Sequence, residues 1–448
     1  MPDHPRSLKV DQTLGGHDRV DGERIVQKIV KRLIPFLFLC YIVNYIDRIN
    51  IGYAALEMKE SLRFSDAVYG LGASMFFVGY VFFEIPSNLI MQKVGARLWI
   101  ARIMVSWGAV SSSMMWVTSP SSFYMLRFLL GAAEAGFFPG TIFYLSHWIP
   151  AKQRARAVAL FLTSTALSGV IGGPLSGALL KLGGMGGLMG WQWLFLLEGI
   201  PAVVLGLATL RYLDDLPAEA RWLSLEEREW LTRRMREESE EKQRHHGYTL
   251  FQALTNIKVW RLCLLYFSII ISYYGVVFWL PQIFKGFSGL SNFMVALLSA
   301  VPYFIAAVGM VLVGNHSDRT GERPRHVAFS ALLGSAGLLM SAYFSHENPV
   351  LAFLALCLAA LGIWSTLGPF WSLPTEFLTG TAAAGGIALI NSMGNVGGFV
   401  GPSVVGFVKN QTGSFTGGLF VLAATLVVGC LLALSVKEQK KDASATRQ

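Results

Sequence analysis

Long apolar stretches alternate with short polar segments along most of the chain. A membrane-spanning helix needs about 20 mainly apolar residues, and we identify twelve stretches of suitable length. Within each stretch the apolar residues are continuous rather than alternating, which favours helices over a transmembrane β-barrel. The pattern predicts an all-α membrane protein with twelve transmembrane helices, at residues 33–53, 68–91, 98–117, 121–147, 156–180, 192–212, 259–284, 293–314, 325–345, 349–371, 384–408 and 416–436.

A charged segment at residues 213–258 divides these stretches into two sets of six. Its part from Leu223 to Gln243 is rich in Glu, Arg and Leu, which predicts an amphipathic helix. We interpret this helix as a solvated cytoplasmic connection and not as a binding site. The expected organisation is a tail at 1–32, a six-helix half at 33–212, the linker at 213–258, a second half at 259–436 and a tail at 437–448.

Two sequence features that occur in both halves indicate that the halves are pseudo-symmetric. The pair Gly173-Pro174 in the fifth stretch returns as Gly401-Pro402 in the eleventh, and the polar loop at 92–97 resembles the loop at 318–323. Duplicated halves are typical of carriers that hold their substrate near the membrane midplane and expose it to each side in turn. The chain is therefore expected to work by alternating access.

The distribution of positive charge predicts the orientation in the membrane. Basic residues concentrate before the first stretch and in the links after the even-numbered stretches, so both termini are expected in the cytoplasm. Only 15% of the residues are charged, against about 25% in soluble domains. The net charge of +9 therefore fits orientation in a lipid bilayer, and we expect no nucleic-acid partner.

Other residue types limit the possible functions. The four cysteines all lie in apolar stretches, which is typical of small buried side chains rather than of disulfides or metal ligands. The histidines do not have metal-ligand spacing, so no metal site is expected. A phosphate-binding Gly-x-x-x-x-Gly-Lys-Ser/Thr loop is absent from the sequence, which argues against ATP-driven transport.

Charged residues inside the apolar stretches are the strongest functional signal. Each costs at least about 2.5–3.5 kcal/mol at the bilayer centre and is kept mainly where it faces a polar cavity. Asp47 and Arg48 lie in the first stretch. In the fourth, Arg127, Gly131 and Glu134 share one helix face. Counting residues along the helices places Arg127 level with Asp47, so all four charged residues should line one cavity, and Gly131 should let another backbone approach closely.

This set offers a coupling device. Consecutive helix residues do not face each other, so Asp47 could instead reach a guanidinium on a neighbouring helix, with Arg127 the leading candidate by depth. Protonating Asp47 or Glu134 would free an arginine to pair with an incoming carboxylate through a two-pronged contact. The alternative is that these residues form static ion pairs between helices, most of all for Arg48.

Further candidates for substrate contacts are polar and aromatic residues on the apolar stretches. The tyrosines could offer hydroxyls to a hydroxy acid or act as interface anchors. Trp371 and Ser372 on the tenth stretch could line the cavity or could equally pack in the protein core. Two asparagines on the eleventh stretch share a face with Gly398, and the sequence does not choose between them. The candidates are Tyr45, Tyr80, Tyr273, Tyr274, Gln282, Trp371, Ser372, Asn391 and Asn395.

The loop after the eighth stretch resembles the signature of the major facilitator superfamily. It contains Gly314, Asp318, Arg319, Gly321 and Arg323 at the matching spacing. A weaker copy after the second stretch keeps Gly95 and Arg97 but has Gln92 and Lys93 in place of the usual aspartate and arginine. The resemblance implies the major facilitator fold. We expect both loops to be conformational latches and not substrate contacts.

A finer resemblance is carried by residues 44–52, 84–88, 127–140, 190–195 and 385–391. Together these segments are similar to the anion:cation symporter family, most of all to bacterial tartrate, phthalate and 4-hydroxyphenylacetate carriers and more distantly to galactonate and hexuronate carriers. The likeness covers nearly the whole chain apart from its tails. It implies proton-coupled uptake of an organic anion across a bacterial inner membrane, with substrate contacts from Tyr80 and the asparagine region.

Residues and resemblance together predict a proton:organic-anion symporter, not an enzyme, working as a monomer with protons as coupling ion and no other cofactor. Asp47 and Glu134 are the expected proton sites, and Arg48 and Arg127 the anion-facing or coupling cations. A tartrate-like hydroxy acid is the first expected substrate, and an aromatic acid is the second. The alternatives are an exchanger or facilitator without proton coupling, and a transporter-like anion receptor.

Overall fold

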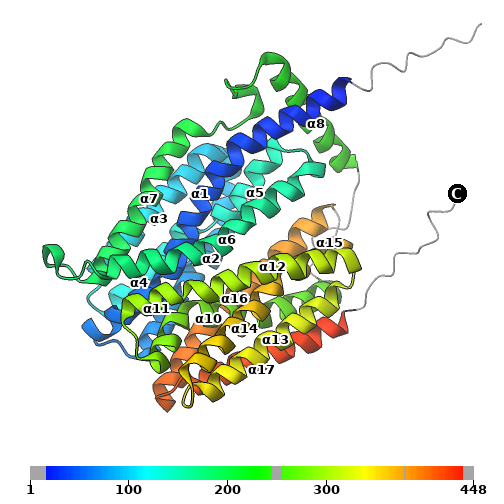
Figure 1. Cartoon of the computed structure of the whole chain (residues 1–448). Coiled ribbons are helices and arrows are strands. Elements are labelled where there is room, and N and C mark those ends of the chain that lie inside the picture. Colours follow the sequence, from blue (N-terminus) through cyan, green and yellow to red (C-terminus); the bar gives the residue numbers. More distant parts are fainter. Residues whose placement is uncertain (1–16, 245–254, 378–379, 437–448) are drawn as a thin grey trace, which may run out of the picture.

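The computed structural model describes residues 17–244, 255–377 and 380–436, and the regular structure in these ranges is helical (Figure 1). Part of the expected N-terminal tail (1–16), the whole expected C-terminal tail (437–448) and part of the expected linker (245–254) lie outside the described residues. The first half consists of α1 (His17–Ser61), α2 (Asp66–Val94), α3 (Ala96–Ser113), α4 (Pro120–Glu134), α5 (Phe137–Trp148), α6 (Ala151–Leu180) and α7 (Gly190–Tyr212).

After the linker helix α8 (Leu225–Arg244), the second half has a similar series. It consists of α10 (Ile257–Ser288), α11 (Asn292–Leu298), α12 (Ala300–Thr320), α13 (Arg323–Phe344), α14 (Pro349–Ser365), α15 (Leu367–Phe377), α16 (Gly380–Thr412) and α17 (Thr416–Ser435). Short 3-10 turns cover Met114–Trp116, Met185–Gly187 and Pro217–Glu219.

Each of the twelve expected stretches coincides with one helix or with two consecutive helices. The pairs α4/α5, α11/α12 and α14/α15 each cover one stretch. Among the described residues, nine helical segments are long and apolar enough to cross a membrane. The other three expected stretches fall on α3, α6 and α16, so the helix series is consistent with the predicted twelve spans.

The two halves meet mainly along four helix pairs. Helix α2 packs against α16, α6 packs against α11 and α12, and α1 packs against α10. Helix α8 lies against α1 and α5 at one end of the molecule, which we call the linker end (Figure 1). The opposite end, where α1 ends and α2 begins, is called the far end.

Helix α8 is docked on the first half. Lys28 on α1 donates to Glu227 at 2.6 Å, and Arg154 on α6 donates to Glu238 at 2.9 Å. Leu231 is fully buried, which agrees with the apolar face expected for this helix. The linker helix is thus anchored by polar contacts and one buried leucine rather than only surrounded by solvent.

Helices α2 and α4 cross at two glycines. A Cβ on Gly131 would lie 1.8 Å from the carbonyl oxygen of Phe76, and a Cβ on Gly79 would lie 2.0 Å from that of Phe128. Only glycine permits this approach, because any side chain would meet backbone atoms. The close approach expected at Gly131 is confirmed, and it fixes α4 with its charged residues against α2.

The loops expected to act as latches differ in where their carboxylate comes from. Gly321 has φ 73° and Gly95 has φ 93°, a region that favours glycine. Beside Gly321, Arg323 lies 3.8 Å from Asp318 of its own loop, and Arg319 is exposed. In the first half, the backbone N–H of Arg97 donates to Asp215 at 2.8 Å. Asp215 follows α7, so the missing aspartate at Gln92 is replaced from another part of the chain.

Asp215 also caps the N-terminus of α3, where unpaired N–H groups favour a negative charge. Replacing Asp215 by Asn keeps an acceptor but removes the charge, so we expect the free energy of unfolding to fall by about 0.3–1 kcal/mol. Thermal unfolding of the purified protein checks this. Asp318→Asn is the matched control, because Asp318 is exposed and contacts Arg323 only at 3.8 Å. An equal loss in both variants would contradict the capping role.

Candidate functional site

Arg48 lies at the centre of the interface between the halves. Its side chain pairs with Glu134 of α4 and donates to the hydroxyl of Tyr274 on α10 at 3.3 Å. The guanidinium also lies over the rings of Phe76 and Tyr80, 5.2 and 5.5 Å from their centroids. One buried cation therefore contacts a carboxylate of its own half and a hydroxyl of the other half.

A break between α4 and α5 positions Glu134. It is the last residue of α4, and Gly136 with φ 89° lets the chain turn before α5 starts. Ser87 donates to the carbonyl of Ala135 at 2.7 Å, which satisfies a backbone acceptor left at the break. A carboxylate at a helix C-terminus is electrostatically unfavourable, and Arg48 offsets this.

The hydrogen bonds of Asp47 come from neutral side chains. Its carboxylate accepts from Ser111 of α3 and, at 3.0 Å, from Asn50 of α1. Arg127 instead donates to the carbonyl of Ala73 at 3.1 Å. The expected pair between Asp47 and Arg127 was therefore wrong. Both residues are almost completely buried, at 1% and 0% exposed, and in the described structure Oδ2 of Asp47 and Nη1 of Arg127 have no hydrogen-bond partner.

The two arginines remain neighbours beside one aromatic ring. The Arg127 guanidinium lies 5.2 Å from the centroid of Phe76, the same distance as that of Arg48. Two positive charges beside one ring favour a nearby anion. Oε2 of Glu134 is also unpartnered among the described residues. The cluster therefore contains hydrogen-bond donors and acceptors that its internal contacts do not use.

The second half contributes hydroxyl and amide groups to the same interface. The hydroxyls of Tyr45 and Tyr273 hydrogen-bond to each other across the halves. Asn391 on α16 donates to Glu84 on α2 at 3.0 Å. Asn395, one turn further along α16, has a buried amide nitrogen with no partner in the described part of the chain.

The remaining sequence candidates lie on α10 and α15. Trp371 packs edge-on against Tyr266 with centroids 4.9 Å apart, and Ser372 donates to the carbonyl of Gly368 at 3.3 Å. Gln282 lies eight residues beyond Tyr274 on α10, about 12 Å along the helix. It accepts from Lys59 at 2.9 Å near the far end. The structure thus does not bring Gln282 into the central cluster.

One buried carboxylate at the interface, Glu84, was missed as a site candidate, and a second, Glu198, lies outside the central cluster. Glu84 is 8% exposed and bonds Asn391 across the interface, and Glu198 on α7 is 3% exposed and accepts from Ser176 at 2.8 Å. Both lie in apolar stretches, so the cost of a charge in the membrane would have identified them as it identified Asp47.

The arrangement can exchange partners at Arg48. A neutral Glu134 would hold the guanidinium less strongly, and an arginine presents several N–H groups in a fork that matches a carboxylate. The hydroxyl of Tyr274 and the amide of Asn391 could then contact the rest of a bound acid. The central cluster (Asp47, Arg48, Arg127, Glu134, Tyr274 and Asn391) is chemically suited to bind an anion in response to protonation.

The chain is similar to known membrane transporters. Residues 37–402 match the family profile described as "Major Facilitator Superfamily". A protein of Agrobacterium vitis named "Putative tartrate transporter" is 49% identical over 95% of this chain and 94% of its own. The "Inner membrane transport protein RhmT" of Escherichia coli K12 is 39% identical over 93% of this chain and 96% of its own.

The fold agrees with this likeness. The structure of the xylose transporter XylE of E. coli superposes with a TM-score of 0.75 at 14% identity, covering 92% of this chain and 99% of that one. The profile match extends over most of the chain, and the helices follow the same architecture. The protein is therefore an integral membrane transporter and belongs to the major facilitator superfamily.

Proposed function

We propose that this transporter couples the uptake of a small organic carboxylate to the uptake of protons. The likeness to transporters named for tartrate supports an organic anion as substrate. The observation that carries the proposal is the buried contact of Arg48 with Glu134 of one half and Tyr274 of the other. A tartrate-like hydroxy acid is the first candidate, and an aromatic acid is the second.

The proposed cycle starts with a proton on Glu134. Protonation removes the negative charge that holds Arg48, so the guanidinium can pair with the substrate carboxylate through two N–H donors. Asp47 is the second proposed proton site, held by Ser111 and Asn50. Arg127, bound to the carbonyl of Ala73, adds positive charge beside the site. The halves then rock about the cluster and expose it to the other side.

The orientation and setting are part of the same proposal. The basic loops support a cytoplasmic location for both termini, which would make the linker end cytoplasmic and the far end periplasmic in a bacterial inner membrane. Both arginines and both proton sites belong to one chain, so a monomer is sufficient. The hydroxyls of Tyr45, Tyr80 and Tyr273 and the amides of Asn391 and Asn395 are the proposed contacts for the uncharged part of the substrate.

Acidification driven by substrate tests the coupling between anion and proton uptake. Proteoliposomes that contain a pH-sensitive dye should show acidification of the lumen when tartrate is added outside, because each anion would bring protons with it. Empty liposomes are the control for passive entry of the acid. Entry of tartrate without acidification would favour the exchanger or facilitator, while tartrate binding without any entry would favour the receptor.

A further inference from the structure

A pocket at the far end of the molecule lies outside the central cluster. Its volume is about 530 Å³, within the roughly 300–1,000 Å³ typical of small-molecule sites. Residues of α1, α2, α10 and α16 line it, so it joins the two halves. Its rim includes the exposed residues Glu60, Ser65 and Asn410.

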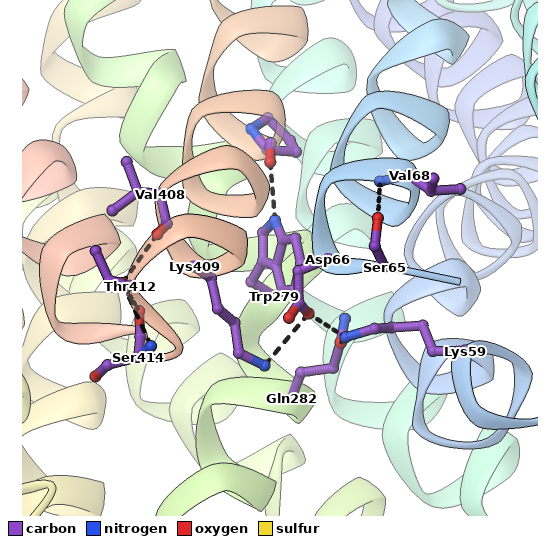
Figure 2. A network of polar contacts seen from close by, with 11 residues as sticks. Lys59, Ser65, Asp66, Val68, Trp279, Gln282, Val408, Lys409, Thr412 and Ser414 are labelled. Atoms are coloured by element: carbon purple, nitrogen blue, oxygen red, sulfur yellow. Dashed lines mark hydrogen bonds and ion pairs between the residues drawn. The ribbon is translucent and has the colours of Figure 1, made fainter. Parts of the chain in front are cut away.

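One carboxylate and two lysines connect the halves in this pocket. Asp66, the first residue of α2, pairs with Lys59 of α1 and lies 3.3 Å from Lys409 of α16 (Figure 2). Lys59 also donates to Gln282 of α10 at 2.9 Å. The contacts from Asp66 to Lys409 and from Lys59 to Gln282 cross between the halves, so both must break if the far end opens.

The pocket is suited to an anion. Three lysines (Lys59, Lys285 and Lys409) and two acidic residues (Glu60 and Asp66) line it, which leaves one positive charge in excess. Gln282 is 7% exposed, and its Nε2 donor is buried without a partner in the described ranges. A carboxylate in this pocket would therefore find ammonium donors and an unused amide donor together.

We propose that this pocket is an outer gate site for a small organic anion and that Asp66 occupies the place of that anion when the gate is closed. An entering carboxylate competes with Asp66 for Lys59 and Lys409. Once Lys409 has exchanged its partner, α2 and α16 are no longer tied and the far end opens. The inference rests on the proposed function, because the ligand belongs to the transported class.

The energetics permit such an exchange. The side chains of Lys59, Asp66 and Lys409 are 17%, 21% and 19% exposed, so solvent and salt weaken their attraction. A ligand shifts a conformational equilibrium only if it binds one state better. That condition is met here, because Asp66 competes for the lysines in the closed state and has left Lys409 in the open state.

Ala55 provides a reporter for opening. It lines the pocket but is only 3% exposed, and the four native cysteines are buried, so an Ala55→Cys variant should react slowly with maleimide. Adding Asp66→Asn should accelerate this labelling several-fold, and Asp66→Glu should restore slow labelling because it keeps the charge. Equal labelling rates in the Ala55→Cys protein with and without Asp66→Asn would overturn the proposed gate.

The anion is tested with tartrate on the purified Ala55→Cys protein. Tartrate should accelerate labelling there, and also in the Lys181→Gln control, since Lys181 lies over Phe293 at 3.4 Å, away from Asp66. The response should disappear when Lys59 and Lys409 are both glutamine. Labelling that tartrate leaves unchanged, or accelerates equally in the double variant, would overturn the anion site. Failure of the gate and failure of the proposed function can be told apart. The Asp66→Asn comparison tests the gate without any substrate, whereas failure of the proposed function would appear as absence of organic-acid flux.

Discussion

Replacing Glu134 by glutamine should abolish the accumulation of tartrate against its gradient while leaving tartrate exchange intact. Glutamine has nearly the shape of a protonated glutamate, so Arg48 would always be free to pair with substrate. The carrier could still bind and reorient, but no proton would be bound and released at this position. The measurement is uptake driven by an imposed pH gradient in proteoliposomes, compared with counterflow between equal pH values.

The matched control is Glu198→Gln. Glu198 is a buried carboxylate of the same half, but its partner is Ser176 and not an arginine. This variant should accumulate tartrate as the native protein does. Accumulation that survives unchanged in Glu134→Gln would exclude Glu134 as the coupling site. Equal losses in both variants would show that any buried carboxylate of this half matters, and not the contact with Arg48.

Gly131→Ala should be among the most destabilising single substitutions in the chain. The new Cβ would lie 1.8 Å from the carbonyl oxygen of Phe76, and backbone atoms cannot move aside as a flexible side chain can. Overpacking of this kind costs typically 1–3 kcal/mol and occasionally more, and we expect about 3 kcal/mol or more here. The thermal unfolding midpoint and the yield of monodisperse protein in detergent measure the effect.

Gly368→Ala is the control for the general effect of replacing a helical glycine. A Cβ at Gly368 would meet no atom within 4 Å, and alanine favours a helix by up to about 1 kcal/mol relative to glycine. This variant should be as stable as the native protein or slightly more so. If Gly131→Ala were equally stable, α2 and α4 would not be in the tight contact described.

Features that depend on local periodicity could be predicted from the sequence. The apolar stretches coincide with helices because lipid and packing impose length and composition on each one independently. The shared face of Arg127, Gly131 and Glu134 follows from the helical repeat alone, and both charged residues on that face are buried. The linker helix, expected from Leu223 to Gln243, is observed from Leu225 to Arg244.

Features that depend on the rotation and end of each helix could not be predicted in the same way. Counting residues placed Arg127 at the height of Asp47, but height does not say which way a side chain points, and Arg48 rather than Asp47 reaches α4. The break after Glu134 depends on Gly136, which in the sequence resembles any packing glycine. Gln282 lies outside the central cluster because it is eight residues from Tyr274, about 12 Å along α10.

The central cluster has an uneven composition with a consequence for engineering. Its four charged residues belong to the first half, whereas Tyr274 and Asn391 of the second half are uncharged. Under the proposed function, the residues that couple protons are therefore all encoded in the first half, whereas the second half supplies part of the contacts to the substrate. Chimeras that join the first half of this chain to the second half of a relative should inherit the proton requirement from the former and should shift the preferred acid toward that of the latter.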